Sequence, residues 1–233
     1  MRILALLFPR FTAIDLIGPA NCWGLIPGVQ FQFAAAQAGA LPMDFGGPQA
    51  DIVATHDFTT CWQDPDVLLV PGGGKAAFEA LDDDLYLDAI ARIGANAGWV
   101  TSVCNGSLLL GAAGLLKGYK AACYWYSRDG LALFDAEPVN ERVVIDRNRA
   151  TGGGMTAGVD FGLHMIGQWA GESNGALTEL LMEYAPQPPF GSGRPELASP
   201  DTLATARGIL QTEMPNERAA QAARRRGFAQ PRG

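Results

Sequence analysis

Hydrophobic residues along the chain form short runs, separated by turn residues and by segments with helical spacing. The clearest runs are residues 2–8 and 67–70, and residues 29–36 and 99–103 are also rich in β-branched or aromatic side chains. Runs of this length are typical of strands that are covered on both faces, as in a parallel sheet. Because strands and helices alternate, the pattern predicts an α/β fold in which a doubly wound parallel sheet is sandwiched by helices.

The predicted helices differ in how clearly their ends are marked. Residues 82–96 have an acidic first turn, which suits the positive end of a helix dipole, and residues 200–214 are predicted as a last amphipathic helix. Further helices are predicted over residues 108–113, 128–134, 159–170 and 173–184. A strand over residues 141–146 is followed by a polar hairpin turn.

The C-terminal part of the chain has a different composition from the rest. Residues 185–193 contain three prolines and are predicted as an irregular arm, and the cationic run at residues 224–226 is interpreted as a solvated helix end. We find no internal repeat and no linker. The sequence therefore predicts a single domain over residues 1–233, with a core over about residues 1–190 and a C-terminal arm and helix over about residues 191–233.

Composition and charge argue against several classes of protein. The chain has 233 residues, of which 48% are hydrophobic, so it can build a sizeable core without disulfides. A net charge of −7 argues against a nucleic-acid partner, because no broad basic face can form. The four cysteines show no CxxC spacing and there are two histidines, so we expect no metal and a reducing, cytoplasmic environment. No apolar run approaches 18 residues, so we expect no membrane span.

Cys104 lies where a predicted strand must turn sharply into a helix. A thiol at that position faces the N–H groups and the positive dipole end of the following helix, which favour the nucleophilic thiolate. The three residues after Cys104 are small and let a substrate approach closely. These features predict a cysteine nucleophile elbow, and the alternative is that Cys104 is only a buried apolar residue.

Asp15 is the one acidic residue in an apolar segment that follows the first predicted strand. It can serve as the N-cap of the next helix. It can also project into the cleft beyond the carboxyl ends of the strands, where ligands bind in open α/β sheets and where Cys104 is expected to lie. The residues by themselves leave both interpretations open.

Two glycine runs follow predicted strands, at residues 72–74 and 152–154, and both permit close backbone approach. The first lacks the spacing of a phosphate-binding loop, so we interpret it as an anion-stabilising turn whose N–H groups face the cysteine cleft. We assign Gly73, Asn105 and Thr156 as candidate residues that bind the substrate or an oxyanion, and Thr156 is also a plausible N-cap.

Residues 15–19, 66–73, 101–107 and 151–158, taken in this order, resemble the motifs of the ThiJ/PfpI superfamily. Within that superfamily, the chain is most similar to the isonitrile hydratases. The resemblance implies a flavodoxin-like homodimer with Cys104 as the nucleophile, a neighbouring acid at Asp15 and no cofactor or metal. It also implies hydration of an isonitrile to an N-formamide through a cysteine thioimidate.

The chain departs from the family pattern at two positions. Asn105 stands where the hydratases often carry threonine, and Tyr124 stands where many superfamily members carry a histidine. Amide hydrolysis by cysteine usually needs a histidine base, whereas hydration of an isonitrile needs only one carboxyl that moves a proton beside the sulfur. The alternatives are a glyoxalase-like enzyme, which the absent histidine disfavours, and a non-enzymatic module of the same fold that binds a ligand or senses cysteine oxidation.

Overall fold

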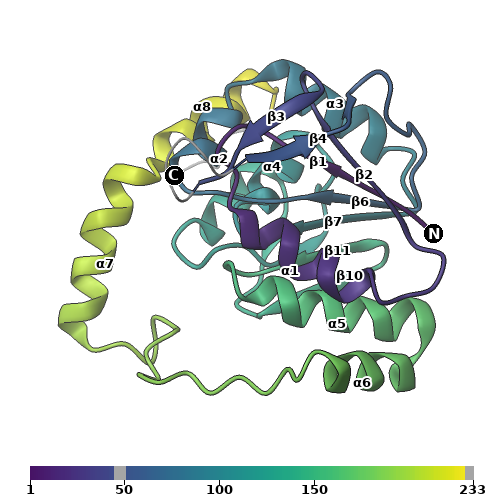
Figure 1. The fold of residues 1–233 in the computed structure, drawn as a ribbon. Coiled ribbons are helices and arrows are strands. Elements are labelled where there is room, and N and C mark those ends of the chain that lie inside the picture. The colour runs from purple at the N-terminus through teal and green to yellow at the C-terminus, as the bar shows by residue number, and fades with distance from the viewer. Residues whose placement is uncertain (45–50, 229–233) are drawn as a thin grey trace.

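The computed structural model describes residues 1–44 and 51–228, and within them a seven-stranded sheet forms the centre of the molecule (Figure 1). The strand order is β10-β11-β7-β6-β1-β2-β5, and every neighbouring pair is parallel except the β10–β11 hairpin. The strands are β1 (Arg2–Leu6), β2 (Gln30–Ala35), β5 (His56–Asp57), β6 (Val67–Val70), β7 (Trp99–Val103), β10 (Val143–Asp146) and β11 (Arg149–Gly152). This arrangement confirms the predicted doubly wound α/β fold.

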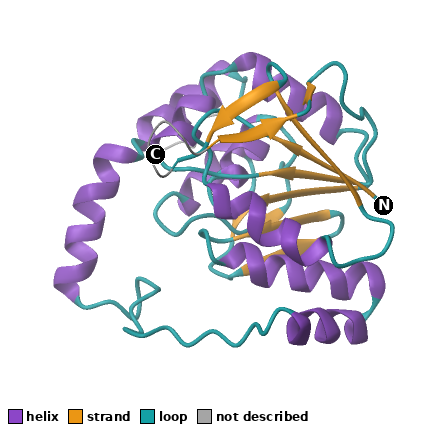
Figure 2. Cartoon of the chain, viewed as in Figure 1, coloured by secondary structure: helices purple, strands orange, loops and turns teal. Residues whose placement is uncertain are grey.

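Two groups of helices flank the sheet (Figure 2). Helix α5 packs against both α1 and α6, and on the other side α4 packs against α2, α3, α8 and the 3₁₀ helix η2. The helices are α1 (Ala13–Trp23), α2 (Lys75–Ala80), α3 (Asp84–Gly94), α4 (Gly106–Ala112), η2 (Arg128–Phe134), α5 (Ala157–Ala170), α6 (Glu172–Leu181), α7 (Pro200–Glu213) and α8 (Asn216–Arg225). Two small sheets are separate from the main one, and they pair β3 (Gly39–Pro42) with β4 (Asp51–Ala54) and β8 (Lys120–Ala121) with β9 (Glu137–Pro138).

The central strands explain why the apolar runs predicted the sheet well. Strand β6 is buried along its whole length, because it lies between β1 and β7 and helices cover both faces of the sheet. A strand in that position must be apolar at every residue, and its bounds match the predicted run at residues 67–70. The carboxyl ends of β1, β6 and β7 lie side by side, so the segments after them meet at one edge of the sheet.

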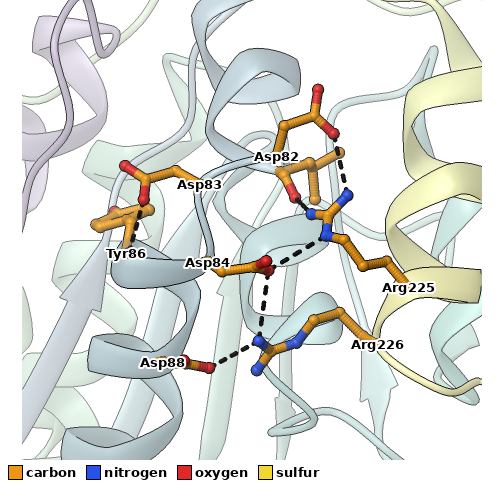
Figure 3. A network of polar contacts seen from close by, with 8 residues as sticks. Asp82, Asp83, Asp84, Tyr86, Asp88, Arg225 and Arg226 are labelled. Carbon is orange, nitrogen blue, oxygen red and sulfur yellow. Dashed lines mark hydrogen bonds and ion pairs between the residues drawn. The ribbon is translucent and has the colours of Figure 1, made fainter.

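The C-terminal helices differ from the prediction. The bounds of α8 were not predicted, but residues 224–226 do lie at a helix end as expected, and Arg224 and Arg225 are exposed there. The run is more than a solvated end, because Arg225 and Arg226 make ion pairs. Both arginines pair with aspartates of α3 (Figure 3), with Arg226 Nη1 at 2.7 Å from Asp88 Oδ1 and Arg225 Nε at 3.2 Å from Asp84 Oδ1. Under the helix, the alanines at positions 219, 222 and 223 are buried at helical spacing, and this apolar face holds α8 against the body.

Helix α7 lies differently from the other helices, because none of its residues is buried. The segment between α6 and α7 has no regular secondary structure and runs along the outside of the molecule (Figure 1). A Ser199 N-cap begins α7, and its hydroxyl accepts a hydrogen bond from the Thr202 N–H. After α7, the chain returns to the body at Met214, which is buried.

Candidate active site

Cys104 occupies a sharp turn between β7 and α4. Its φ of 59° is in the left-handed region, which non-glycine residues rarely adopt and which stores strain of order 1 kcal/mol or more. The Cys104 N–H donates to the carbonyl oxygens of Gly152 and Gly153, at 3.1 and 2.8 Å, so the β11–α5 loop holds the turn in place. A Cβ at Gly106 would clash with the carbonyl oxygen of Val70, and glycine therefore lets α4 begin directly against β6. This is the geometry of a nucleophile elbow.

Asp15 lies inside α1, and its carboxyl points toward the loop that follows β6. The carboxyl is fully buried, and its Oδ2 accepts a hydrogen bond from the Gly72 N–H at 3.0 Å. Its Oδ1 has no hydrogen-bond partner among the described residues. Thr12 occupies the N-cap position of α1, so the interpretation of Asp15 as a helix cap is wrong. The carboxyl is held beside the Cys104 thiol, as the other interpretation expects, but it is buried too deeply to project into the cleft itself.

Burial controls the ionisation of Asp15. It raises the pKa of the carboxyl to about 8, and the Gly72 N–H and the neighbouring Cys104 thiol lower that pKa only in part. The charge of Asp44 adds a smaller increase. The carboxyl is therefore protonated at neutral pH, the state required of a general acid.

The ionisation of Cys104 differs from the prediction. Burial and the Asp15 charge raise the pKa of the thiol well above its usual value, and the N–H groups of Met155 and Asn105 lower it only in part. The predicted stabilisation of a thiolate by the following helix is thus outweighed by desolvation. Helix α4 has seven residues, so its dipole is small. The buried pair of Cys104 and Asp15 consequently favours the neutral form of both groups.

A cavity of about 410 Å³ opens above the Cys104 thiol. Its walls come from the loop after β6, the elbow, the β11–α5 loop and the end of α7. Tyr124, Met155, Leu210 and Met214 give it apolar, aromatic and thioether surfaces, and charged side chains lie among the other lining residues. The cavity is large enough for a small organic molecule with an apolar substituent.

Of the predicted binding residues, Gly73 lines the cavity, but its carbonyl oxygen accepts a hydrogen bond from Asn105 Nδ2 at 2.8 Å. The Asn105 side chain is fully buried, and its Oδ1 accepts a hydrogen bond from the Ser127 hydroxyl at 2.6 Å. The expected hydrogen bond from the Asn105 amide to a substrate is therefore not available in this arrangement. The backbone N–H of Asn105 instead lies near the Cys104 thiol.

Thr156 is not brought to Cys104. Its side chain is exposed, its hydroxyl accepts a hydrogen bond from Arg142 Nη2 at 3.1 Å, and it lines a separate cavity. It occupies the N-cap position of α5 but makes no capping hydrogen bond. Met155, which has a φ of 33°, faces the Cys104 cavity in its place. The β11–α5 loop therefore presents Met155 to the site, and not the next residue, Thr156, as the sequence predicted.

The two histidines lie outside the site. His56 is in β5 at the edge of the sheet, and its ring nitrogens contact Gln32 Nε2 and Thr55 Oγ1 at 3.1 and 2.8 Å. His164 is exposed on α5. Tyr124 lines the cavity beside Cys104, and burial raises the pKa of its phenol, so it is a neutral hydroxyl there. Asp15 is accordingly the titratable group placed to exchange a proton with the thiol.

Sequence reasoning did not identify Leu210 and Met214 as site residues. Both belong to the end of a helix that the sequence predicts only as amphipathic, and no motif marks them.

Within the described residues, no cluster of three or more histidine, cysteine or acidic side chains is arranged to hold a metal ion. In the same part of the chain, no helix is both long and apolar enough to cross a membrane.

The fold and the elbow define a class of protein, and sequence comparison agrees with it. The model of the DJ-1/PfpI family matches residues 1–168, and the chain belongs to that family. It is 40% identical to the isonitrile hydratase of Pseudomonas putida over 209 residues, which are 89% of each chain. The crystal structure of a ThiJ/PfpI family protein from Pseudomonas syringae superposes with a TM-score of 0.90 at 40% identity, over 97% of this chain and 90% of that one.

A protein of a different kind is similar in sequence to part of the chain. The HTH-type transcriptional regulator GbdR of Pseudomonas aeruginosa is 36% identical over 121 residues, which cover 50% of this chain and 32% of the regulator. The similarity to the hydratase therefore extends over far more of both proteins than the similarity to the regulator.

Proposed function

We propose that this protein is an isonitrile hydratase, a hydro-lyase that adds water to an isonitrile and releases an N-formamide. The observation that carries the proposal is the buried pair of Cys104 and Asp15, in which a carboxyl with a raised pKa and a free oxygen lies beside the thiol and no histidine lines the cavity. The similarity to the hydratase of Pseudomonas putida supports it. Hydration of an isonitrile is a reaction for which one sulfur and one carboxyl suffice.

The first half of the reaction forms a covalent intermediate. The pair is neutral at rest, and the form that reacts has lost the thiol proton, which leaves Cys104 as thiolate and Asp15 as carboxylic acid. The sulfur attacks the terminal carbon of R–N≡C, and the Asp15 O–H transfers its proton to that carbon. The product is a thioimidate, R–N=CH–S–Cys104, and Asp15 is left as a carboxylate.

The second half releases the product and restores the pair. Water adds to the thioimidate carbon, while the Asp15 carboxylate takes one of its protons and passes it to the nitrogen. Collapse of the tetrahedral intermediate forms the formyl C=O and breaks the C–S bond. The remaining hydroxyl proton goes to Asp15, so R–NH–CHO leaves and the thiolate–carboxylic acid pair is regenerated. The net reaction is R–NC + H₂O → R–NH–CHO, without a cofactor or metal.

We further propose that the protein is a cytoplasmic homodimer. All four cysteines are free and buried, which fits a reducing compartment. The apolar side chains of Leu177, Leu180 and Leu181 are 53, 77 and 65% exposed on α6. Adjacent exposed leucines of this kind commonly mark a contact between protein chains.

The proposal is tested by incubating the protein with an aryl isonitrile and following the matching N-formamide by chromatography. We expect turnover by the wild type and none by Cys104→Ala. In Asp15→Asn, which keeps the shape but removes the ionisable group, we expect a loss of at least about a hundredfold. The matched controls are Cys61→Ala and Asp201→Asn, which remove the same groups away from the cavity and should retain activity.

The outcomes separate the alternatives. In ¹⁸O-labelled water, the hydratase reaction places the label in the formyl oxygen. Loss of activity in a folded Cys61→Ala equal to that in Cys104→Ala would contradict the assignment of the nucleophile. Absence of N-formamide together with turnover of a small dicarbonyl would instead favour a glyoxalase-like enzyme. Absence of both reactions, with selective oxidation of Cys104 by peroxide, would favour a sensor.

A further inference from the structure

Met214 is buried at a point where its surroundings in the chain are exposed. Helix α7 has no buried residue, yet Met214, which follows it directly, is only 7% exposed. The Met214 N–H donates to the Leu210 carbonyl oxygen at 2.8 Å, so the end of α7 stays continuous up to this residue. The exposed helix thus ends in one side chain that is inserted into the body.

The Met214 side chain lies between two elements of the candidate active site. Its Sδ accepts a hydrogen bond from Asn105 Nδ2 at 3.5 Å, and Asn105 is the residue after Cys104. Its methyl carbon Cε is 3.6 Å from the position that a Cβ on Gly74 would occupy, in the loop after β6. Together with Leu210, one turn earlier on α7, Met214 forms one wall of the cavity above the thiol.

Helix α8 fixes this wall to the body. It begins two residues after Met214 and packs its buried alanine face against α2, α4 and η2. Arg218 Nη1 is 2.9 Å from Asp82 Oδ2, and Arg225 also donates to the Leu81 carbonyl oxygen. The aspartates that Arg225 and Arg226 bind lie just before α3 and in its first two turns (Figure 3). These contacts anchor the chain immediately after Met214.

We propose that Met214, supported by Leu210, is the specificity-determining residue that limits the size of the isonitrile's R group. This inference rests on the proposed function and extends it to a substrate class, namely isonitriles whose apolar substituent fits against a thioether wall. Methionine suits such a position, because its flexible, polarisable side chain packs well against apolar and aromatic groups. A change of even one methylene in an apolar pocket shifts specificity by about 10–200-fold.

The first experiment measures kcat/KM for 2-naphthyl isonitrile and for n-butyl isonitrile. We expect Met214→Ala to raise the naphthyl-to-butyl ratio by at least about tenfold, because it removes the wall. Met214→Phe, which narrows the cavity, should lower the same ratio. Ile209→Ala is the matched control, since Ile209 is 60% exposed on the same helix, and it should leave the ratio unchanged. An unchanged ratio in both Met214 variants, each shown to be folded, would overturn the proposal. If Met214→Ala does not fold, an unchanged ratio in a folded Met214→Phe overturns it alone.

A second experiment does not depend on hydratase activity. Iodoacetamide and a bulky N-naphthyl iodoacetamide both alkylate Cys104 by displacement of iodide by sulfur, and mass spectrometry of the Cys104 peptide gives the two rates. Met214→Ala should raise the bulky-to-small ratio of these rates, and Ile209→Ala should not. If the ratio shifts while the wild type hydrates no isonitrile, the size limit at Cys104 stands and the proposed function fails. If the wild type hydrates isonitriles and neither ratio shifts, the inference about Met214 fails.

Discussion

At the scale of single residues, the buried Asp15 carboxyl connects the chemistry of the site with the stability of the fold. Its pKa is raised to about 8 from an ordinary value of 3.8, mainly by burial. A proposed acid–base group needs a pKa near the working pH, and a carboxyl reaches that range only when the protein makes its charged form unfavourable. The same burial must therefore lower the stability of the folded state whenever Asp15 ionises.

The sign of this effect follows from proton binding. Between about pH 4 and pH 8, the folded protein holds a proton on Asp15 that the unfolded chain has released. The contribution of Asp15 to the free energy of unfolding is thus fully present below pH 4 and is lost as pH rises toward 8. The loss is on the order of a few kcal/mol, at about 1.4 kcal/mol for each unit of pKa.

We predict that Asp15→Asn becomes progressively more stable than the wild type between pH 5 and pH 8. The amide keeps the neutral shape of the carboxyl but cannot ionise, so it avoids the cost that the wild type incurs at higher pH. Urea unfolding of both proteins at several pH values measures the difference in the free energy of unfolding. A difference that does not change with pH would contradict the raised pKa of Asp15.

At the scale of elements, helix α8 is held by a small network of ion pairs. Asp84 Oδ1 lies 3.2 Å from Arg225 Nε and 3.6 Å from Arg226 Nη1, so one carboxylate contacts two guanidinium groups (Figure 3). The next residue toward the N-terminus, Asp83, has a different role. It is the N-cap of α3, and its carboxylate accepts a hydrogen bond from the Tyr86 N–H. Adjacent aspartates therefore allow ion pairing and capping to be measured separately.

We predict that Asp84→Asn lowers the free energy of unfolding by about 0.5–1 kcal/mol at low salt, and by less at 1 M salt. These pairs are partly exposed, so solvent and salt screen most of their attraction. Asp83→Asn is the matched control, because asparagine caps a helix about as well as aspartate and this change should be nearly neutral. Denaturant unfolding at two salt concentrations checks both variants. Equal losses in the two variants would show that the ion pairs do not hold α8.

At the scale of the whole molecule, the exposed leucines of α6 form an apolar surface just before the C-terminal arm. Leu177, Leu180 and Leu181 come from one helix, which contacts α5 but has only Thr178 buried. An amphipathic helix normally buries its apolar stripe, and this one leaves three leucines in solvent. A second copy of the chain would cover them at a two-fold interface.

We predict a dimer at micromolar concentration, measured by light scattering. Leu180→Glu places a charge among the exposed leucines and should shift the protein toward the monomer, because a buried unpaired charge is costly. The control is Leu85→Glu, at a leucine that is 62% exposed on α3 on another part of the surface. A monomeric wild type would refute the proposed dimer, and dissociation by both variants would argue against α6 as the interface.

The sequence by itself determined the features that depend on neighbours in the chain. An apolar run predicts β6 to the residue, since a strand in the middle of a covered sheet has no polar face. The small residues after Cys104 predict a tight turn, and its φ of 59° confirms it. The ordered motifs predict the family, which the match over residues 1–168 confirms.

The tertiary structure decided the features that depend on distant residues. It determined that desolvation outweighs the helix end at Cys104, that the Asn105 amide is held inside the protein and that Thr156 points away from the cavity. It also brought Met214 to Asn105 across 109 positions of the chain. The local sequence pattern carries no information about which distant side chains pack around a site. Those side chains form the walls of the cavity, and by excluding water they set the pKa values of Cys104 and Asp15.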